Sequence, residues 1–223
     1  MKKEEDMVLE TERKRIAEFG RKMLEAGLTT GTGGNISIFS REKGLLAITP
    51  SSVEYTKLEP ENVLVMKPDG SVAEGSMNPS SETGFHLALY ARRPDIGSVV
   101  HTHSPYAATY ACLGREIPAV HYLVGFAGKK VPLAPYATYG SEKLADNISS
   151  SIGTFNAVLL ANHGLVAVGE TLERAFNTAE EIELAARISY QAECIGTPVV
   201  LSDDEMERVI EKFKTYGQAS NEG

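Results

Sequence analysis

Two histidines separated by a single residue, His101 and His103, are the side chains of this 223-residue chain best suited to bind a metal ion. They end a segment, Ser98 to His103, in which the apolar pair Val99 and Val100 predicts a β-strand. Residues two apart in a strand point to the same face of the sheet. Both imidazoles can therefore converge on one ion.

A third histidine, His163, is a candidate for the same site. It lies in the segment Ala161–Gly164, which we expect to form a tight turn between two apolar strands. Three nitrogen ligands with one open position are typical of a catalytic zinc site. The spacing alone leaves a second interpretation open, in which the pair arises by chance and His163 is simply solvated, because nothing local brings it to the pair.

The two remaining histidines are interpreted differently. His86 follows Glu82 by one turn of a predicted helix, and we expect it to be a packed or hydrogen-bonded core residue rather than a ligand. His121, next to Tyr122, is expected to be structural or to lie at an interface.

A carboxylate and several hydroxyls gather where an anion could bind. The segment Asn78–Glu82 places two serine hydroxyls and a carboxylate at a predicted helix start, where free N–H groups and the helix dipole favour negative charge. Two further donor-rich segments are Gly31–Asn35, whose glycines allow close approach of a ligand, and Thr49–Ser52. Taken singly, such residues are more often a plain helix cap, a first-turn acid or a hairpin turn than a ligand site.

The apolar periodicity predicts the elements that must position these residues. It indicates a mostly antiparallel sheet combined with helices, in one α/β domain covering 1–223. We expect strands at 36–39, 45–48, 63–66, 98–103, 131–134, 157–160 and 165–168. We expect helices ending at Gly27 and covering 81–93, 105–113, 141–150 and 171–195, and a last one beginning at Ser202 in a capping box.

Composition narrows the class of protein. An apolar content of 42% supports a sizeable core, and a net charge of -8 argues against a nucleic-acid or anionic-membrane surface. Cys112 and Cys194 lie in apolar periodic segments and are interpreted as buried small hydrophobic residues. Without a signal peptide or a membrane-spanning apolar run, we expect a soluble cytoplasmic protein with no membrane partner.

The ordered motifs resemble the class II aldolase/adducin-head family, and within it the L-fuculose 1-phosphate aldolases. The likeness covers nearly the whole chain, and so many matches in order are specific. The matching segments are Gly31–Asn35, Ile48–Pro50, Pro79–Glu82, His101–His103, His121–Tyr122, Ala134–Thr138, Asn162–Gly164 and Glu211–Gly217.

The resemblance implies a fold, an assembly and a set of site residues. The fold is an α/β/α sandwich around a mostly antiparallel sheet, and the assembly is a homotetramer with active sites between subunits. His101, His103 and His163 match the zinc ligands. Glu82 matches the general acid/base, which can also touch the metal, and Tyr122 and Tyr216 match tyrosines that reach over the site. The positions matching phosphate-binding residues are Thr32, Asn35, Ser51, Ser52, Ser80 and Ser81, with Ser52 replacing a glycine of the fuculose enzymes.

The implied reaction is a reversible, zinc-dependent retro-aldol cleavage of a ketose 1-phosphate. The expected substrate is L-fuculose 1-phosphate, giving dihydroxyacetone phosphate and L-lactaldehyde through a metal-stabilised enediolate. A pentulose phosphate 4-epimerase and a methylthioribulose 1-phosphate dehydratase remain alternatives with related metal sites, although Glu82 resembles the aldolases and the epimerases carry aspartate there. The non-enzymatic alternative is an adducin-like binding module, which has no need of the three histidines.

Overall fold

One open eight-stranded β-sheet forms the centre of the computed structural model, which describes residues 7–215. The strand order is β4-β3-β2-β1-β5-β8-β7-β6. All neighbouring strands are antiparallel except β6 and β7, which are parallel, so the prediction of a mostly antiparallel sheet is confirmed. The strands are β1 (Asn35–Ser40), β2 (Leu45–Ile48), β3 (Leu64–Met66), β4 (Val72–Glu74), β5 (Ser98–Thr102), β6 (Leu133–Ala134), β7 (Ala157–Leu160) and β8 (Gly164–Gly169).

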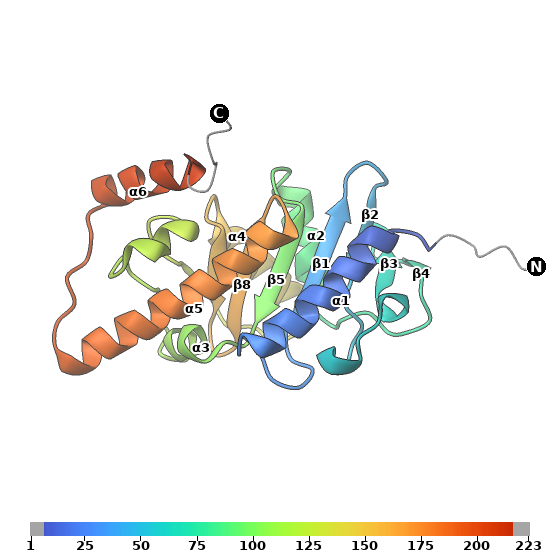
Figure 1. Cartoon of the computed structure of the whole chain (residues 1–223), viewed down its shortest axis with the longest axis horizontal. Helices are drawn as coiled ribbons and strands as arrows, with labels where there is room; N and C mark the ends of the chain where they lie inside the picture. Colours follow the sequence, from blue (N-terminus) through green and yellow to red (C-terminus); the bar gives the residue numbers. More distant parts are fainter. Residues whose placement is uncertain (1–6, 216–223) are drawn as a thin grey trace, which may run out of the picture.

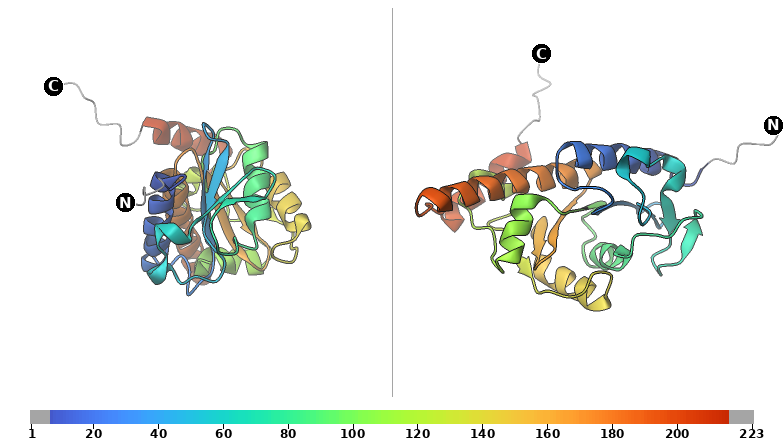
Figure 2. Two further views of the ribbon diagram at one scale, coloured as in Figure 1. Left: turned by 90° about the vertical axis from the view of Figure 1, so that its right-hand side faces the viewer. Right: turned by 90° about the horizontal axis from the view of Figure 1, so that it is seen from below.

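Helices cover both faces of this sheet, as expected for an α/β/α sandwich (Figures 1 and 2). They are α1 (Glu10–Glu25), α2 (Thr83–Arg92), α3 (Pro105–Cys112), α4 (Glu142–Ile152), α5 (Leu172–Ile195) and α6 (Asp203–Thr215). Helices α1, α3 and α5 pack on one face, and α2 and α4 pack together on the other. Within the described part of the chain, no helix combines the length and apolarity needed to cross a lipid bilayer.

Alternation along the strands divides the core into two layers and aims the metal-ligand candidates. Val100 belongs to the layer under α1, α3 and α5, whereas Val99 belongs to the layer under α2 and α4. His101 follows Val99 by two positions, so its side chain points to the α2 side of the sheet. The start of α2, where Glu82 lies, is on that same side.

The three central strands bring distant segments together at one end of the sheet. In the pairing of β1 with β5, Asn35 lies opposite His101. In the pairing of β5 with β8, Thr102 lies opposite Leu165. His163 precedes Leu165 by two residues, in the tight turn between β7 and β8, and therefore arrives beside the end of β5.

The predicted helix ends coincide with local capping interactions. Gly27 follows α1 with a φ of 69°, the left-handed conformation expected there. The side chains of Ser141 and Thr171 accept backbone N–H groups at the starts of α4 and α5. At the start of α6, the Ser202 hydroxyl accepts from the Glu205 N–H at 3.2 Å, which supplies the serine half of the expected capping box.

The prediction that the two cysteines are buried is wrong. Cys112 and Cys194 are both exposed and neither forms a disulfide. Each helix does bury an apolar face, but that face consists of residues such as Ala107 and Ala111 in α3 and Ala186 in α5. The cysteines lie off these faces, so membership of an apolar segment did not decide their burial.

Candidate metal centre and active site

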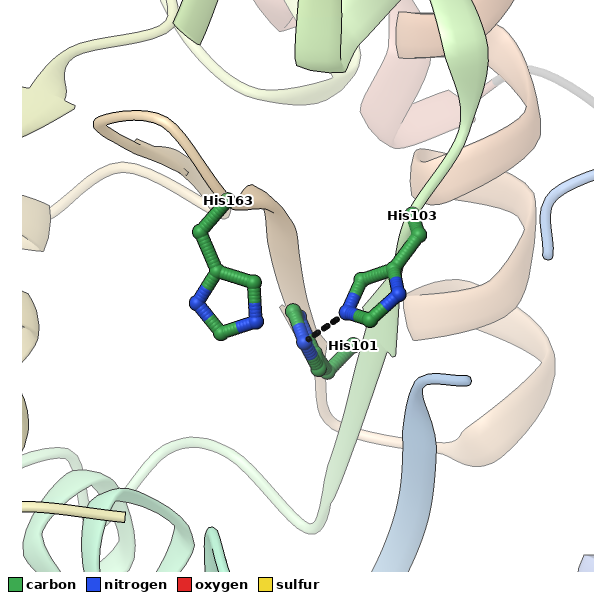
Figure 3. Close-up of side chains that lie close together, drawn as sticks. All are labelled: His101, His103 and His163. Carbon is green, nitrogen blue, oxygen red and sulfur yellow. Dashed lines mark hydrogen bonds between the residues drawn. The ribbon is translucent and has the colours of Figure 1, made fainter. Parts of the chain in front are cut away.

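The three histidines predicted as metal ligands meet in space, with their ligand nitrogens all within 4.8 Å of one another (Figure 3). His101 is buried, His163 half-buried and His103 exposed, so the cluster is covered by protein on the His101 side and reaches the surface on the His103 side. Burial, followed by the charge of His101, lowers the pKa of both His103 and His163 to about 4. Their imidazoles are therefore neutral near pH 7 and offer free lone pairs.

A hydrogen bond to the backbone fixes which nitrogen His101 presents to the cluster. Its Nδ1 lies 2.9 Å from the carbonyl oxygen of Leu165, to which only an N–H can donate. Nε2 is then the atom that faces the other groups, 3.1 Å from Nε2 of His103. Orienting a ligating imidazole through its other ring nitrogen is the usual arrangement in protein metal sites.

The carboxylate of Glu82 completes the cluster. Its Oε2 lies 3.2 Å from Nε2 of His101, and its Oε1 lies 3.6 Å from Nε2 of His163. Although burial raises the pKa of Glu82, the charge and hydrogen bond of His101 outweigh it, with smaller contributions from His163 and Asn35. The net effect holds the pKa of Glu82 well below its usual value, so the side chain is an anion.

These groups fit a divalent cation. If Nε2 of His101 gives up its proton, its lone pair faces the lone pairs of His103 Nε2 and Glu82 Oε2, and a bound cation is then needed to offset the repulsion. Two nitrogens about 2.0–2.1 Å from a tetrahedral zinc ion lie about 3.3–3.4 Å apart, close to the 3.1 Å separation of His101 and His103. In addition, Glu82 Oε1 is a buried oxygen with no hydrogen-bond partner.

Glycines allow the histidines to pack this closely. A Cβ on Gly33 would lie 2.8 Å from Nδ1 of His103, and one on Gly34 would lie 2.4 Å from the carbonyl oxygen of His101. A Cβ on Gly164 would lie 2.3 Å from the carbonyl oxygen of Thr102. We expected the glycines of the Gly31–Asn35 turn to allow close approach of a ligand. In the structure, Gly33 allows close approach of the His103 ring, and Gly34 allows close approach of the His101 backbone.

A cavity of about 660 Å³ opens in front of the cluster. His103, His163 and Glu82 line it, together with every residue predicted to bind phosphate. Those residues are Thr32, Asn35, Ser51, Ser52, Ser80 and Ser81. The hydroxyl-bearing residues Thr32, Ser52 and Ser81 are exposed, and Ser51 is half-exposed.

Two of the residues predicted to bind phosphate are already engaged within the protein. Asn35 is only 3% exposed, and its side-chain N–H donates to Glu82 Oε2 at 2.9 Å. The Ser80 hydroxyl accepts from the backbone N–H of Glu82 at 3.3 Å. In this structure Asn35 therefore holds the Glu82 carboxylate, and Ser80 holds the Glu82 backbone.

Tyr122, one of the two tyrosines implied by the resemblance, does not line the cavity of its own chain. Tyr122 begins the 3₁₀ helix Tyr122–Phe126, is 49% exposed and packs near Phe213 of α6. Tyr216 lies outside the described residues.

Two other tyrosines, Tyr136 and Tyr139, line the cavity and were not singled out as site residues. They are 62% and 70% exposed. The signal that could have found them is the segment Ala134–Thr138, which the family resemblance did include; Tyr136 lies in it and Tyr139 directly follows it.

Comparison with known proteins places this geometry in a family. The family model described as "Class II Aldolase and Adducin N-terminal domain" matches residues 14–190. A relative from Bacillus thuringiensis serovar kurstaki named 5-deoxy-D-ribulose 1-phosphate aldolase is 53% identical over 95% of this chain and 100% of its own length. A 5-methylthioribulose-1-phosphate/5-deoxyribulose-1-phosphate aldolase from Rhodospirillum rubrum is 42% identical over 91% of this chain and 90% of its own.

A solved structure gives the same result. An L-fuculose 1-phosphate aldolase superimposes with a TM-score of 0.90 at 46% identity, covering 92% of this chain and 96% of its own. Enzymes of this class are metal-dependent aldehyde-lyases, which agrees with a histidine cluster able to hold a metal ion. The chain belongs to the class II aldolase and adducin N-terminal domain family and is an aldolase similar to the L-fuculose phosphate aldolases.

Proposed function

We propose that this aldolase cleaves a ketose 1-phosphate between C3 and C4, releasing dihydroxyacetone phosphate and a short aldehyde. The observation that carries the proposal is the unpartnered, buried Oε1 of Glu82, held beside three histidine nitrogens at the wall of an open cavity. A carboxylate in this position can exchange a proton with a sugar carbon next to the metal site.

We infer that the metal is Zn²⁺ and that His101, His103 and His163 hold it, with Glu82 as a further ligand when no substrate is present. Three imidazole nitrogens and an open fourth side are the donor set of a catalytic zinc site. When bound, the ion supplies Lewis-acid stabilisation of the negative charge that develops on the sugar oxygens.

Glu82 moves the proton. In the synthesis direction its free Oε1 accepts a proton from the hydroxyl-bearing carbon of dihydroxyacetone phosphate, and in the cleavage direction it returns that proton to the same carbon. Asn35 holds Oε2 meanwhile, so the carboxylate keeps its orientation as the proton moves. Proton transfer by a positioned group of this kind typically contributes about 10²–10⁴-fold to the rate.

No lysine lies among the residues that line the cavity in the described part of the chain. A Schiff-base aldolase needs an amine at the carbonyl carbon. The composition of the cavity wall therefore favours the metal-dependent route.

The exposed hydroxyls form the proposed phosphate site. Thr32, Ser51, Ser52 and Ser81 line one cavity and come from three separate turns. Hydroxyls and turn N–H groups can hold a phosphate without a basic side chain, so the net charge of -8 is no obstacle.

Tyr122 belongs to the proposal as a residue supplied to a neighbouring active site. It is half-exposed and outside the cavity of its own chain, as expected for a side chain that reaches another subunit. We propose that the chain forms a homotetramer in which Tyr122 protonates the aldehyde oxygen, and that Tyr216 acts as a second tyrosine over the site. An active monomer, measured by light scattering with activity, would contradict this assignment of Tyr122.

For the substrate we propose 5-deoxyribulose 1-phosphate ahead of L-fuculose 1-phosphate. The Bacillus relative named for deoxyribulose phosphate matches at 53% identity along its full length, and the fuculose aldolase structure matches at 46%. The exposed rings of Tyr136 and Tyr139 offer apolar surface in the cavity, which suits the terminal methyl group that both candidate sugars carry.

A panel of ketose 1-phosphates tests the proposal. Zinc-loaded protein is incubated with 5-deoxyribulose 1-phosphate, L-fuculose 1-phosphate and ribulose 1-phosphate, and the products are resolved by mass and stereochemistry. We expect dihydroxyacetone phosphate from the first two, with acetaldehyde or lactaldehyde respectively, and a higher kcat/KM for the deoxypentulose. A pentulose phosphate inverted at C4 would indicate an epimerase, a dehydrated product would indicate a dehydratase, and either would overturn the proposal.

A further inference from the structure

A continuous chain of buried hydrogen bonds ends on the proposed proton-transfer residue Glu82. Its centre is His86, which is 0% exposed and lies one helical turn after Glu82 in α2. One ring nitrogen of His86 lies 2.5 Å from Oδ1 of Asn35, and the other lies 2.7 Å from the hydroxyl of Ser37. None of the steps proposed above uses His86.

The direction of each hydrogen bond follows from the carboxylate end. Glu82 is ionised and can only accept, so Asn35 must present its N–H to Oε2 and its carbonyl oxygen to His86. His86 must then donate from Nε2, which leaves Nδ1 as the acceptor for the Ser37 hydroxyl. The chain therefore requires a neutral His86 protonated on Nε2.

The surroundings of His86 keep it neutral. Burial is the main cause, and the nearby His101 the second, of a pKa lowered to about 3. The far end of the hydrogen-bond chain is also buried, since Ser37 is 0% and Tyr90 4% exposed. The Tyr90 hydroxyl lies 2.8 Å from the hydroxyl of Ser37 and donates to its carbonyl oxygen at 3.0 Å. A fully buried and satisfied network of this kind restricts its members to one arrangement.

The alternative arrangement would disturb Glu82 directly. Without a donor at His86, the Asn35 amide is free to turn over and to place its oxygen against Oε2 of Glu82. Two acceptor oxygens at 2.9 Å would repel, and the carboxylate would lose the hydrogen bond from the Asn35 amide. The orientation of Glu82 thus depends on which end of Asn35 faces it.

We propose that His86 is a positioning residue that fixes the Asn35 amide, so that Asn35 holds Oε2 of Glu82 and Oε1 stays turned toward the substrate. The inference rests on the proposed role of Glu82 in proton transfer. It also assigns the side chain of Asn35 to the carboxylate and leaves phosphate binding to the exposed hydroxyls.

Two substitutions of nearly equal shape separate positioning from packing. His86→Gln keeps an amide donor near the position of Nε2, whereas His86→Met has the same length and no donor. We expect kcat for ketose 1-phosphate cleavage to fall about 10–100-fold in His86→Met, the usual effect of removing an outer hydrogen-bond partner of a metal site. KM should stay unchanged, and His86→Gln should recover kcat to within about threefold of wild type, a smaller loss than that range.

A control variant addresses stability. Leu89→Ala removes a buried side chain from the same helix without touching the chain of hydrogen bonds. It should lower the unfolding midpoint and leave kcat near the wild-type value. Equal kcat in His86→Met and His86→Gln, or a kcat loss in Leu89→Ala as large as in His86→Met, would overturn the proposal.

A spectroscopic readout keeps this inference separate from the proposed activity. Long-range ¹H–¹⁵N correlations in the full-length, metal-loaded wild type report the His86 tautomer without any substrate. The Nε2–H form supports the proposal, and the Nδ1–H form or a charged ring overturns it. If the wild type cleaves no sugar of the panel while His86 shows the Nε2–H form, the proposed function fails and the hydrogen-bond assignment stands.

Discussion

Adding a single methyl group at Gly33 should weaken metal binding without unfolding the protein. The Cβ of Gly33→Ala would lie 2.8 Å from Nδ1 of His103 and 2.9 Å from the hydroxyl of Thr29. The φ of Gly33 is not in the left-handed region, so alanine fits its backbone conformation. The substitution therefore acts through the contacts with His103 and Thr29 and not through left-handed backbone strain.

The displacement can be worked from these distances. Ordinary contacts of a Cβ begin at 3.4 Å, which exceeds 2.8 Å by 0.6 Å, so the ring must retreat by about that amount. Metal–ligand distances tolerate only about ±0.2 Å. We expect zinc affinity to fall about 10–100-fold, which corresponds to about 1.4–2.7 kcal/mol of binding free energy.

Competition with a fluorescent chelator at fixed pH measures this affinity, and Gly31→Ala is the matched control. Gly31 lies in the same turn with a φ of 62° and has nothing within 4 Å of the added Cβ. Alanine there introduces left-handed strain of about 1–2 kcal/mol. The control should therefore lower the stability of the metal-free protein more than Gly33→Ala does, with zinc affinity unchanged.

The opposite pattern would refute the reasoning. Zinc affinity within twofold of wild type in Gly33→Ala, in a protein that remains folded, would show that His103 does not ligate through the observed ring position. A loss of affinity in Gly31→Ala of the same size would show that the turn as a whole, and not its contact with His103, governs binding.

Three further outcomes follow from other contacts. Glu82→Gln should fold and retain zinc but exchange the proton of dihydroxyacetone phosphate about 10²–10⁴-fold more slowly, measured by deuterium incorporation; wild-type exchange would remove Glu82 from the mechanism. Burial lowers the pKa of His86 from 6.5 to about 3. As pH falls from 6.5 toward 3, the imidazole is therefore protonated in the unfolded chain and stays neutral in the folded chain. The stability advantage of wild type over His86→Gln in urea unfolding should then shrink by about 1 kcal/mol between pH 7 and pH 5.5, and an unchanged advantage would argue against a neutral His86. Glu183→Ala removes the acceptor of the Tyr106 and Ala107 N–H groups at the start of α3, at 2.9 and 2.8 Å, and should lower the free energy of unfolding by about 1–3 kcal/mol; an unaltered unfolding midpoint would contradict this.

Short-range sequence patterns predicted most elements and pointed to His101 and His103 as candidate metal ligands. Period-2 and period-3.6 apolar patterns predicted β1, β2, β5, β7 and β8 and the helices, because each of these buries one face or both. The His-x-His spacing predicted two imidazoles on one strand face, and they do converge. His86 was expected to be a hydrogen-bonded core residue, and this is confirmed.

The parts that could not be predicted depend on strand pairing between distant segments. The pairing of β5 with β1 and with β8 brings Asn35 and His163 next to His101 and His103. No local sequence pattern encodes that strand order. The close approach of Gly33 to His103 is a consequence of the same pairing. The amide of Asn35 matched a phosphate-binding position in sequence, while its hydrogen bonds depend on the buried His86.

Metal-stripped protein titrated with Zn²⁺ tests the central claim most directly, with release of dihydroxyacetone phosphate from the preferred sugar of the panel as the readout and His163→Ala as the control. We predict no cleavage without metal, a rate that rises with added zinc and levels off at about one ion per chain, and no response in His163→Ala. Cleavage at the full rate by the stripped protein, or an undiminished zinc response in His163→Ala, would contradict a metal centre built on these three histidines.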